Sequence, residues 1–389
     1  MRSAVLADLL DLCDSGVWGN EEPASGMSVL RSTNFRNDGT LNFENLALRA
    51  IEPAKRVSKL LSRGDLLLEK SGGGPSQPVG RVVLFNGDGL PHTFGNFIAR
   101  LRPKSLVVSE YLWYYLRYFH SLGKTRHYQK QTTGIRNLEF KRYLSIQVPL
   151  RQLDEQRCIV DLLARAEGIV RLRREAQQKA AELIPAIFID MFGDPATNPK
   201  GWQMSAIEEL CPVQTGATPR KEVRLYYEGG TVPWIRTGEV RGLHIRDAAE
   251  RITELAVRDT NCKVFPVNTV LVAMYGQGQT RGRTGMLMTP AATNQACAAI
   301  LPSDKINAMF LFEVVKLQYE RLRAMGRGGN QANLNLGMIK AFQVPRPPME
   351  AQLRFVERVT ALESIQRQQA AAARMSLATF DALLARAFA

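Results

Sequence analysis

The sequence predicts an internally duplicated α+β fold, in which two mixed α/β domains are separated by two long antiparallel helices that form an intramolecular coiled coil. The first observation is a repeat: the last 57 residues repeat a stretch that lies 196 positions earlier, so that Asn137-Leu138 recurs as Asn333-Leu334 and Gln147-Val148-Pro149 as Gln343-Val344-Pro345. The second is that each copy ends in a long segment with helical periodicity. A period this long is typical of domain duplication, not of a solenoid.

Looser matches extend the repeat toward the start of each half. Leu12-Cys13 is expected to correspond to Leu210-Cys211, Leu30-Arg31 to Ile235-Arg236, and residues 65–68 to residues 269–272. The sequence therefore predicts domains over residues 1–150 and 193–345, a central long helix over 151–192 and a C-terminal long helix over 346–389.

Composition is that of an ordinary globular protein of two to three domains. No window approaches the roughly 18 consecutive apolar residues that a membrane helix needs, so no membrane contact is expected. Asp8, Asp11 and Asp14 interrupt any apolar core of a signal peptide, which favours the cytoplasm. The five cysteines are scattered and contain no C-x-x-C pair, so neither a disulfide framework nor a zinc site is expected.

The charge indicates a polyanionic partner. The chain carries a formal net charge of +14, with 27 Lys and Arg against 21 Asp and Glu in residues 1–195 and 24 against 16 in the remainder. Neutralising phosphates releases condensed counterions and so drives association, which makes nucleic acid the leading candidate. A generally basic proteome or an acidic partner subunit would give the same balance.

The first half predicts a strand pair, a helix and a polar turn. Residues 65–70 and 79–85 have the β-rich composition of paired strands around the loop 71–78. An aromatic-rich helix over 110–119 is expected to pack on the sheet, followed by a polar turn over 129–136.

The central helix is the most legible element. Between Arg151 and Met191 apolar residues recur three or four apart with basic residues between them, which predicts an amphipathic helix of more than 30 residues. Pro149 precedes this helix, and the Gly-Asp-Pro of residues 193–195 ends it.

The second half repeats the plan. Strands are expected over 269–274 and 284–288 around the loop 275–283, then a core helix over 309–319 and a polar turn over 326–331. A long helix from Pro348 to the C-terminus matches the central helix in register, so the two are expected to pack against each other.

The loop 275–283 carries the sharpest binding signal. Its glycines allow close backbone approach, Gln pairs with adenine edges, and Arg pairs with guanine edges or phosphates. A mobile hairpin tip would have the same composition. The predicted DNA-contacting residues are Arg31, Lys70, Ser71, Gln77, Arg81, Gln131, Arg136, Arg236, Tyr275, Gln277, Gln279, Thr280, Arg281, Arg283, Asn330 and Gln331.

Catalytic signatures fail on inspection. Gly123-Lys124-Thr125 resembles the end of a phosphate-binding loop, but Tyr118 stands where its first glycine belongs. Residues 139–141 have the E-x-K spacing of metal-dependent nucleases without an upstream Pro-Asp, and residues 198–200 fall short of an amino-methyltransferase motif. No metal or catalytic residue is therefore expected in this chain.

A composite of motifs resembles the central region of the specificity subunits of Type I restriction-modification enzymes. It consists of Gln147-Val148-Pro149-Leu150, then Glu155-Gln156-Arg157, the long helix, and finally residues 191–202, which read Met-Phe-Gly-Asp-Pro-Ala-Thr-Asn-Pro-Lys-Gly-Trp. With the duplication, the resemblance covers nearly the whole chain. The second copy departs from the pattern, since Ala351-Gln352-Leu353 replaces Glu-Gln-Arg.

The resemblance implies a non-catalytic subunit with two target recognition domains, which reads a bipartite double-stranded DNA site across a gap set by the two helices. It also implies methyltransferase (M) subunits and a restriction (R) subunit as partners, which carry S-adenosylmethionine, ATP and Mg. The recognition subunit of a Type IIG or Type IIB system is an alternative, and a coiled-coil scaffold that binds no DNA is another.

Overall fold

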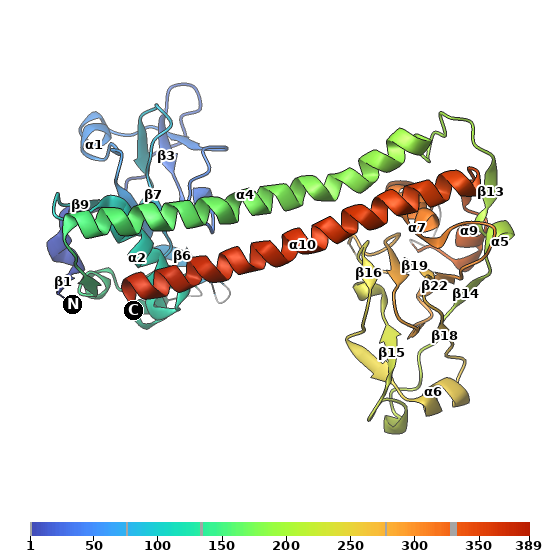
Figure 1. The fold of residues 1–389 in the computed structure, drawn as a ribbon. Coiled ribbons are helices and arrows are strands. Elements are labelled where there is room, and N and C mark those ends of the chain that lie inside the picture. Colours follow the sequence, from blue (N-terminus) through green and yellow to red (C-terminus); the bar gives the residue numbers. More distant parts are fainter. Residues whose placement is uncertain (1, 75–76, 133–134, 277, 327–332) are drawn as a thin grey trace. The chain divides into compact units, whose positions relative to one another are not determined.

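The computed structural model describes residues 2–74, 77–132, 135–276, 278–326 and 333–389 (Figure 1). The chain forms two compact units. Unit 1 comprises Met1–Arg174 and Ala371–Ala389, and unit 2 comprises Glu175–Ala370. Both long helices are divided between the units, so each unit contains one half of each helix.

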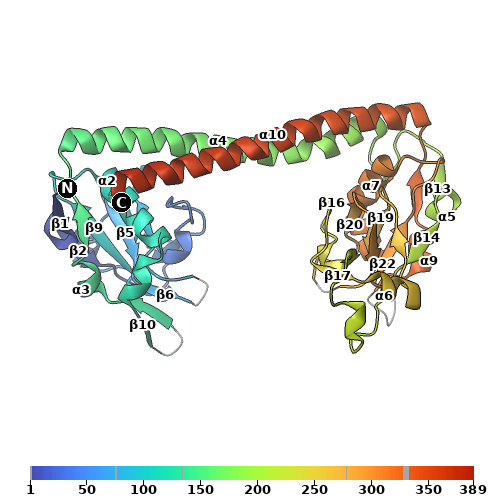
Figure 2. The same ribbon diagram turned by 60° about the horizontal axis from the view of Figure 1, so that its bottom comes forward.

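The two long helices expected from the apolar periodicity are α4 (Leu153–Phe192) and α10 (Met349–Phe388), each of 40 residues. A helix of this length extends about 60 Å at 1.5 Å per residue. In unit 1 Leu163 of α4 shares a hydrophobic core with Phe380 of α10, and in unit 2 Ile184 of α4 shares one with Phe355. The start of each helix thus packs with the end of the other, which makes the pair antiparallel, as Figure 2 also shows.

Unit 1 contains a four-stranded sheet in the order β2-β9-β5-β7, a three-stranded sheet β4-β3-β8, a three-stranded sheet β10-β11-β6 and the pair β1-β12. Neighbouring strands are antiparallel except for β3 and β8. The strands are β1 (Ser3–Val5), β2 (Leu10–Ser15), β3 (Met27–Leu30), β4 (Ala47–Arg49), β5 (Leu66–Glu69), β6 (Ser71–Gly73), β7 (Val82–Leu84), β8 (His92–Phe94), β9 (Ile98–Pro103), β10 (Gln129–Thr132), β11 (Ile135–Leu138) and β12 (Gln147–Pro149). The helices are η1 (Leu6–Leu9), η2 (Ser32–Asn34), α1 (Pro53–Ser58), α2 (Ser109–Ser121), η3 (Lys124–Tyr128) and α3 (Phe140–Tyr143), where η marks a 3-10 helix.

Unit 2 contains a five-stranded sheet in the order β14-β22-β19-β20-β16, a four-stranded sheet β17-β15-β21-β18 and the pair β13-β23. The parallel neighbours are β15 with β21 and β16 with β20. The strands are β13 (Met204–Ala206), β14 (Val213–Thr215), β15 (Val232–Ile235), β16 (His244–Ile245), β17 (Glu250–Ile252), β18 (Val264–Phe265), β19 (Val270–Ala273), β20 (Thr284–Leu287), β21 (Ala291–Thr293), β22 (Cys297–Ile300) and β23 (Gln343–Pro345). The helices are α5 (Ile207–Leu210), η4 (Arg224–Tyr226), η5 (Thr237–Glu239), α6 (Glu254–Asp259), α7 (Ala308–Leu317), α8 (Tyr319–Met325) and α9 (Leu336–Lys340).

The two units share one topology, which confirms the predicted duplication. The order β2-β9-β5-β7 recurs as β14-β22-β19-β20, and β4-β3-β8 recurs as β17-β15-β21 with the same parallel pair. Single hydrogen bonds recur too: the amide of Leu138 donates to Lys70 O at 2.8 Å, and that of Leu334 donates to Met274 O at 3.1 Å. The register between the last 57 residues and the middle of the chain is therefore a structural equivalence.

The expected match of Leu12-Cys13 with Leu210-Cys211 is wrong. Cys13 pairs with Leu101, which pairs with Leu66 at the start of β5. In unit 2 the residue that pairs with the start of β19, at Val270, is Ile300, so Ile300 is the equivalent of Leu101. Ile300 pairs on its other side with Val213. The equivalent of Cys13 is therefore Val213; the connecting segments differ in length, so the sequence offset changes along the chain.

The predicted strand pairs around the two loops are present as β5 with β7 and β19 with β20, both antiparallel. The prediction of a loop over 71–78 and a turn over 129–136 was incomplete. Residues 71–73 form β6, and residues 129–132 and 135–138 form the hairpin β10-β11, which pairs with β6. Strand pairing satisfies the backbone N–H and C=O groups of these residues. Their side chains are mostly polar and show no apolar alternation, so the sequence pattern did not predict these strands.

Each long helix is attached to its unit by an equivalent buried glutamine. Gln156, at 0% exposure, accepts from the amide of Val108 at 2.8 Å and donates to Arg151 O at 2.9 Å and Leu106 O at 3.2 Å. Gln352, at 1% exposure, accepts from the amide of Asn307 at 2.9 Å and donates to Pro347 O at 2.8 Å. Val108 and Asn307 are the N-caps of α2 and α7. The glutamine of the Glu-Gln-Arg segment therefore anchors the helix inside the unit.

The far end of each long helix is anchored by an equivalent phenylalanine. The ring of Phe388 contacts that of Tyr111 on α2, with centroids 5.2 Å apart and an interplanar angle of 62°. The ring of Phe192 contacts that of Phe310 on α7, at 5.0 Å and 75°. These edge-to-face contacts add to the burial of large apolar surfaces. The aromatic helices predicted over 110–119 and 309–319 are thus core helices, α2 and α7.

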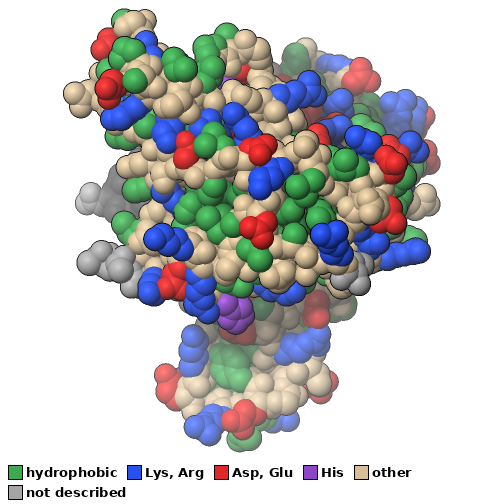
Figure 3. Space-filling model, turned by 90° about the vertical axis from the view of Figure 1, so that its left-hand side faces the viewer, with side chains coloured by type: hydrophobic (Ala, Val, Ile, Leu, Met, Phe, Trp, Pro, Cys, Tyr) green, Lys and Arg blue, Asp and Glu red, His purple; other side chains and the backbone are tan. Residues whose placement is uncertain are grey.

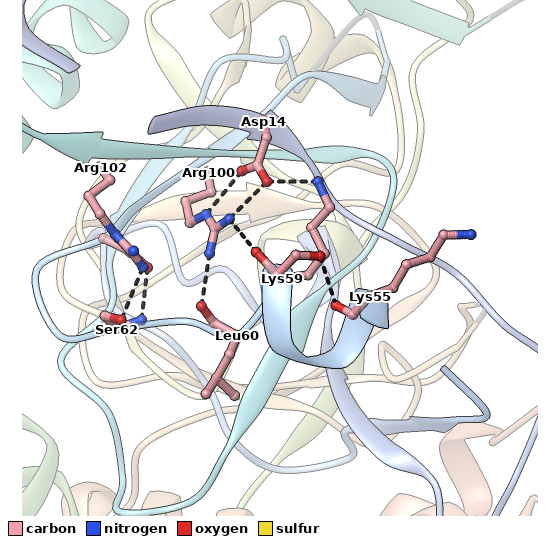
Figure 4. A network of polar contacts seen from close by, with 9 residues as sticks. Asp14, Lys55, Lys59, Leu60, Ser62, Arg100 and Arg102 are labelled. Carbon is pink, nitrogen blue, oxygen red and sulfur yellow. Dashed lines mark hydrogen bonds and ion pairs between the residues drawn. The ribbon is translucent and has the colours of Figure 1, made fainter. Parts of the chain in front are cut away.

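A buried network of charges distinguishes unit 1 (Figure 4). Arg100 is 1% exposed and donates to both oxygens of the Asp14 carboxylate, at 3.0 and 2.8 Å. Lys59 donates to the same carboxylate at 2.7 Å, and Arg100 also donates to Leu60 O at 2.8 Å. Arg100 pairs with Leu67, the second residue of β5. In unit 2 the residue that pairs with Leu271, the second residue of β19, is Ala299.

Candidate nucleic-acid interface

On the face of the molecule that Figure 3 shows, positive side chains do not gather in one patch. Figure 3 shows one face of the molecule, on which Lys and Arg side chains lie among Asp, Glu and hydrophobic side chains. Many exposed cations form ion pairs, such as Arg157 with Asp154 and Arg165 with Asp161. Net charge alone does not locate an interface; cations that lack a carboxylate partner are the better indication.

A Gly-Arg pair stands at the same place in both units, just before β7 and just before β20. In unit 1 Gly80 N donates to Glu69 O and Glu69 N donates to Arg81 O, both at 2.9 Å. Both glycines, Gly80 and Gly282, have positive φ angles, 103° and 83°, a region that favours glycine. The matching bonds in unit 2 join Gly282 N to Ala273 O at 2.8 Å and Ala273 N to Arg283 O at 2.9 Å. Arg81 and Arg283 are therefore structural equivalents.

Arg81 is engaged inside unit 1. Its Nε and Nη2 each donate to the buried carboxylate of Glu69 at 2.8 Å. Its Nη1 and Nη2 also donate to the backbone oxygens of Phe35 and Ser32, at 3.3 and 3.1 Å. With its amide oxygen turned toward the guanidinium, Gln77 accepts from Arg81 at 2.9 Å. Two of the predicted DNA-contacting residues thus bind each other.

Arg283 has a different environment, although the backbone around it is the same. Ala273 takes the place of Glu69, and the Nη2 of Arg283 donates to the Oε1 of Gln279 at 2.9 Å. Within the described ranges no carboxylate lies within ion-pair distance of Arg283. Its charge is therefore not neutralised inside the unit.

The loop 275–283 is anchored to α8. The hydroxyl of Tyr319 donates to Gln279 O at 2.8 Å, and Nη2 of Arg323 donates to Gly278 O at 2.8 Å. Gly276 has a φ of 151° and packs against Thr280 so closely that a Cβ there would lie 2.6 Å from the Thr280 Cβ. These contacts hold a polar loop against a helix instead of leaving it as a free hairpin tip.

Arg81 and Arg283 each line a hollow, and the two hollows share several equivalent wall residues. The wall in unit 1 also includes Phe380, Asp381 and Leu384 of α10, which have no counterpart in the wall of unit 2. The volumes of the hollows are about 200 Å³ in unit 1 and about 350 Å³ in unit 2. Each wall combines a residue that follows η2 or η5, the Arg before β7 or β20, and residues of α2 or of α7 and α8. The polar pairs are Arg36 with Arg241, Arg81 with Arg283, Arg117 with Lys316, and His120 with Tyr319.

Several wall residues were missed by the sequence analysis: Arg36, Arg241, Lys316, Tyr319 and Arg323. One signal was available, since Arg36 lies five residues after Arg31 and Arg241 lies five residues after Arg236. Extending the match of Leu30-Arg31 with Ile235-Arg236 would have paired these two arginines.

The other predicted residues of unit 1 fall in two places. Ser71, Gln131 and Arg136 belong to the sheet β10-β11-β6, where Arg136 pairs with Gln131 and with Gly73. Ser71 Oγ also donates to Asn137 Oδ1. Away from this sheet, Arg31 donates to Asn45 O at 2.9 Å and Lys70 donates to the hydroxyl of Ser15.

The other predicted residues of unit 2 are distributed around the loop. Tyr275 is exposed, Arg281 is half-buried with an Nε that lacks a partner within the described part of the chain, and Arg236 forms an ion pair with Glu250 at 2.9 Å. Gln277, Asn330 and Gln331 lie outside the described residues.

Burial lowers the pKa of two groups in unit 1. Burial, together with the charge of Lys59, lowers the pKa of Lys70. Burial, with the charges of Arg81 and Arg126, lowers the pKa of His120 below its ordinary value. His120 is therefore neutral at pH 7 and adds no charge to the hollow of unit 1.

Two further observations concern the described ranges as a whole. In them no group of three or more His, Cys, Asp or Glu is placed to hold a metal ion. Among the helices in that part of the chain, none has the length and apolar character needed to cross a membrane.

A family model for the Type I restriction modification DNA specificity domain matches residues 199–372. The chain is 27% identical over 159 residues to the specificity subunit of the Type I restriction enzyme MjaIX of Methanocaldococcus jannaschii, an alignment that covers 40% of this chain and 36% of the relative. It is 26% identical over 145 residues to a Type I restriction enzyme specificity subunit of Escherichia coli, covering 36% of each protein. The aligned region thus spans about a third of the length of these curated relatives.

Solved structures share the fold over the whole chain. A chain from a type I restriction-modification system, solved to explain complex assembly and conformational transition, superposes with a TM-score of 0.64 at 18% identity and covers 99% of this chain and 97% of that one. The S subunit of the Type I system of M. genitalium gives a TM-score of 0.62 at 13% identity, over 100% and 96%. The domain match and the named relatives thus make part of the chain similar to the specificity subunits of Type I restriction enzymes, and the solved structures share the fold of the whole chain.

Proposed function

We propose that the chain is the DNA-recognition subunit of a Type I restriction-modification complex and reads a bipartite double-stranded DNA site. In this proposal residues 1–150 and 193–345 are target recognition domains that each read one half of the site. The helices α4 and α10 set the unread gap between the halves. The observation that carries the proposal is the duplication of one topology, down to equivalent hydrogen bonds, because two copies of one reading domain suit a site read in two parts.

Catalysis is delegated in this proposal. The chain itself is non-catalytic and works in the cytoplasm, while M and R subunits carry S-adenosylmethionine, ATP and Mg. Apolar side chains exposed on the long helices support contact with such partners: Leu172 is 60% exposed, Ile365 53% and Met375 71%. In unit 1 Met375 and Ile169 line one hollow, and apolar residues that lie together on a surface are typical of protein-binding sites.

The way each unit is closed supports modular recognition. In unit 2 the first strand, β13, pairs with the last strand, β23, with Met204 opposite Pro345 and Ala206 opposite Gln343. In unit 1 β1 pairs with β12 in the same way, with Ser3 opposite Pro149. A segment whose two ends are paired to each other can be replaced as a block without moving the helices that follow it.

The test is an exchange of residues 207–342, between β13 and β23, for the matching segment of a relative, in cells that express the modification subunit. Mapping methylated bases across the genome should show one half of the modified sequence changed and the other half unchanged. The matched control exchanges residues 6–146, between β1 and β12, and should change only the other half. If either exchange altered both halves, the modular reading would be overturned.

A further inference from the structure

The two equivalent hollows differ in charge, and the difference points to a ligand. In unit 2 Arg241, Arg283 and Arg323 line one hollow, and among the described residues none of the three forms an ion pair. Each uses one or two of its five N–H donors on an oxygen inside the unit: Gly238 O, Gln279 Oε1, and Gly278 O with the Tyr319 hydroxyl. Donors and charge therefore remain available for an anion.

The acidic groups near this hollow do not cancel it. Glu313 pairs with Lys316 at 3.0 Å, and its carboxylate is buried, so it accounts for Lys316 only. Glu320 is the carboxylate on the wall; it is exposed and lies in no ion pair within the described ranges. Three like charges around one hollow repel each other, and a bound anion would relieve that repulsion.

A buried hydroxyl gives a second, independent indication. Thr284 lines the hollow of unit 2, is 2% exposed, and has an Oγ1 without a hydrogen-bond partner in the part of the chain that the structure describes. Buried polar groups without partners are uncommon, because leaving one unsatisfied costs stability. The equivalent wall residue in unit 1 is Val82, which is apolar.

The hollow of unit 1 is internally neutralised. Arg81 is held by both oxygens of Glu69, and Arg117 pairs with Glu167 at 2.8 Å. Hydrogen bonds from Thr40 and the charges of Arg117 and Arg36 lower the pKa of the nearby Asp38 against the opposing effect of burial, so this carboxylate is ionised at pH 7. The same architecture thus presents a satisfied site in unit 1 and an unsatisfied one in unit 2.

We propose that the hollow of unit 2 binds a phosphate group of the DNA backbone. The hollow of unit 1 does not bind one, because Arg81, the equivalent of Arg283, already forms an ion pair with Glu69. A phosphate accepts hydrogen bonds from several guanidinium groups at once, whereas a guanine edge is read by one. A wall of donors with three cations suits the phosphate. This inference rests on the proposed function, and it adds that the two units contribute unequally to the electrostatic part of DNA binding.

The experiment measures binding of the full chain, in complex with its modification subunit, to a fluorescein-labelled DNA duplex of arbitrary sequence. Affinity is followed by anisotropy as salt is raised from about 50 to 200 mM, because the slope of log affinity against log salt falls by about 0.9 for each phosphate that the protein no longer neutralises. Arg283→Gln should lower the slope by roughly one, so that the ratio of the affinities at the two salt concentrations shrinks by about 3.5-fold. Arg283→Lys, which keeps the charge, should keep most of the slope.

One more variant transfers the difference between the units, and another serves as its control. Ala273→Glu places a carboxylate beside Arg283 as Glu69 lies beside Arg81, and it should lower the slope as Arg283→Gln does. Arg258→Gln is the matched control, because Arg258 is exposed, pairs with Asp259 and lies outside the hollow; it should leave the slope unchanged.

The outcomes separate the two proposals. A wild-type complex without salt-dependent DNA binding would overturn the proposed function itself. Wild-type binding with an unchanged slope in Arg283→Gln would overturn only the phosphate site. An equal reduction of the slope in Arg283→Lys and Arg283→Gln would also overturn it, because it would show that Arg283 acts through the loop structure and not through its charge.

Discussion

Unit 1 and unit 2 share a backbone plan and differ in what they bury. Both attach the start of a long helix through one glutamine, Gln156 or Gln352, and both place a positive-φ glycine and an arginine before an equivalent strand. Unit 1, however, buries Asp14 with Arg100 and Glu69 with Arg81, where unit 2 has Ala299 and Ala273 at the places of Arg100 and Glu69. The duplication has preserved the contacts that define the backbone, while the interior charges of the two copies differ.

This difference shows that an arginine at one place in the fold can be paired with a buried carboxylate in one unit and have no such partner among the described residues of the other. A buried ion pair leaves Arg81 with little charge to offer to a ligand, because its field is cancelled at short range by Glu69. Arg283 keeps its charge because no carboxylate of the described residues pairs with it. Whether an arginine at this place is neutralised inside the unit thus depends on the residue of the neighbouring strand, which is Glu69 in unit 1 and Ala273 in unit 2.

The largest expected effect tests that contrast directly. Arg81→Ala removes the partner of a buried carboxylate, and breaking a buried ion pair from one side costs about 3–5 kcal/mol. Arg283→Ala breaks no ion pair and should change the free energy of unfolding by less than about 0.5 kcal/mol. Denaturant unfolding combined with hydrogen exchange would assign the loss to unit 1.

The control removes both charges. Glu69→Ala with Arg81→Met leaves no uncompensated carboxylate, so most of the stability that Arg81→Ala removes should return. Equal destabilisation by Arg81→Ala and Arg283→Ala would mean that the two arginines are equally structural, and the contrast between the units would fail.

The next effect concerns what the units share. Gln156→Ala and Gln352→Ala leave buried backbone groups without partners, which costs about 1–3 kcal/mol in each case. Gln156 makes three hydrogen bonds and Gln352 makes two, so the loss in unit 1 should be the larger. Hydrogen exchange of α2 and α7 would locate the two effects.

Gln178→Ala is the matched control for both glutamines, because Gln178 is an exposed residue of α4. This variant should leave the exchange of α2 and α7 unchanged. A destabilisation by Gln178→Ala as large as that of Gln156→Ala would show that the effect comes from the helix itself and not from its attachment to α2.

Much of the fold, but not all of the candidate site, could be predicted from the sequence. The helices, the strand pairs around both loops and the duplication follow from periodicity and from a repeat offset of 196 residues, which holds from Leu138 with Leu334 to the C-terminus. In the strands before that point the offset changes, to 202 for Arg81 with Arg283 and 205 for Arg36 with Arg241. At the constant offset of 196 residues Arg81 matches Gln277, so that offset alone does not pair Arg81 with Arg283; the looser match of Arg31 with Arg236 pairs only Arg36 with Arg241.

The ion pair between Glu69 and Arg81 could not be predicted from the sequence. Glu69 and Arg81 lie 12 residues apart, and only the antiparallel register of β5 and β7 brings them together. From composition alone both Arg81 and Arg283 were candidates for DNA contact. The backbone register, which depends on turn geometry and packing along the whole sheet, is what makes one of them a structural residue.

The smallest expected effect is the most specific to the hollow of unit 2. Thr284→Val removes a buried hydroxyl that has no partner within the described residues and introduces the side chain that unit 1 has at Val82. Because an unsatisfied buried hydroxyl costs about 1–3 kcal/mol, the variant should be more stable than the wild type by about 1 kcal/mol in the absence of DNA.

If the hydroxyl serves the bound phosphate, the same variant should bind the duplex more weakly while its salt slope stays that of the wild type, since the charge is unchanged. Thermal unfolding and anisotropy on the same preparations would show both changes, with Thr293→Val as the matched control, because Thr293 is also buried, has an Oγ1 without a partner within the described residues, and lies outside the hollow. A variant that gained stability and kept its full affinity would show that the hydroxyl has no part in binding, and the phosphate would then be bound by the arginines alone.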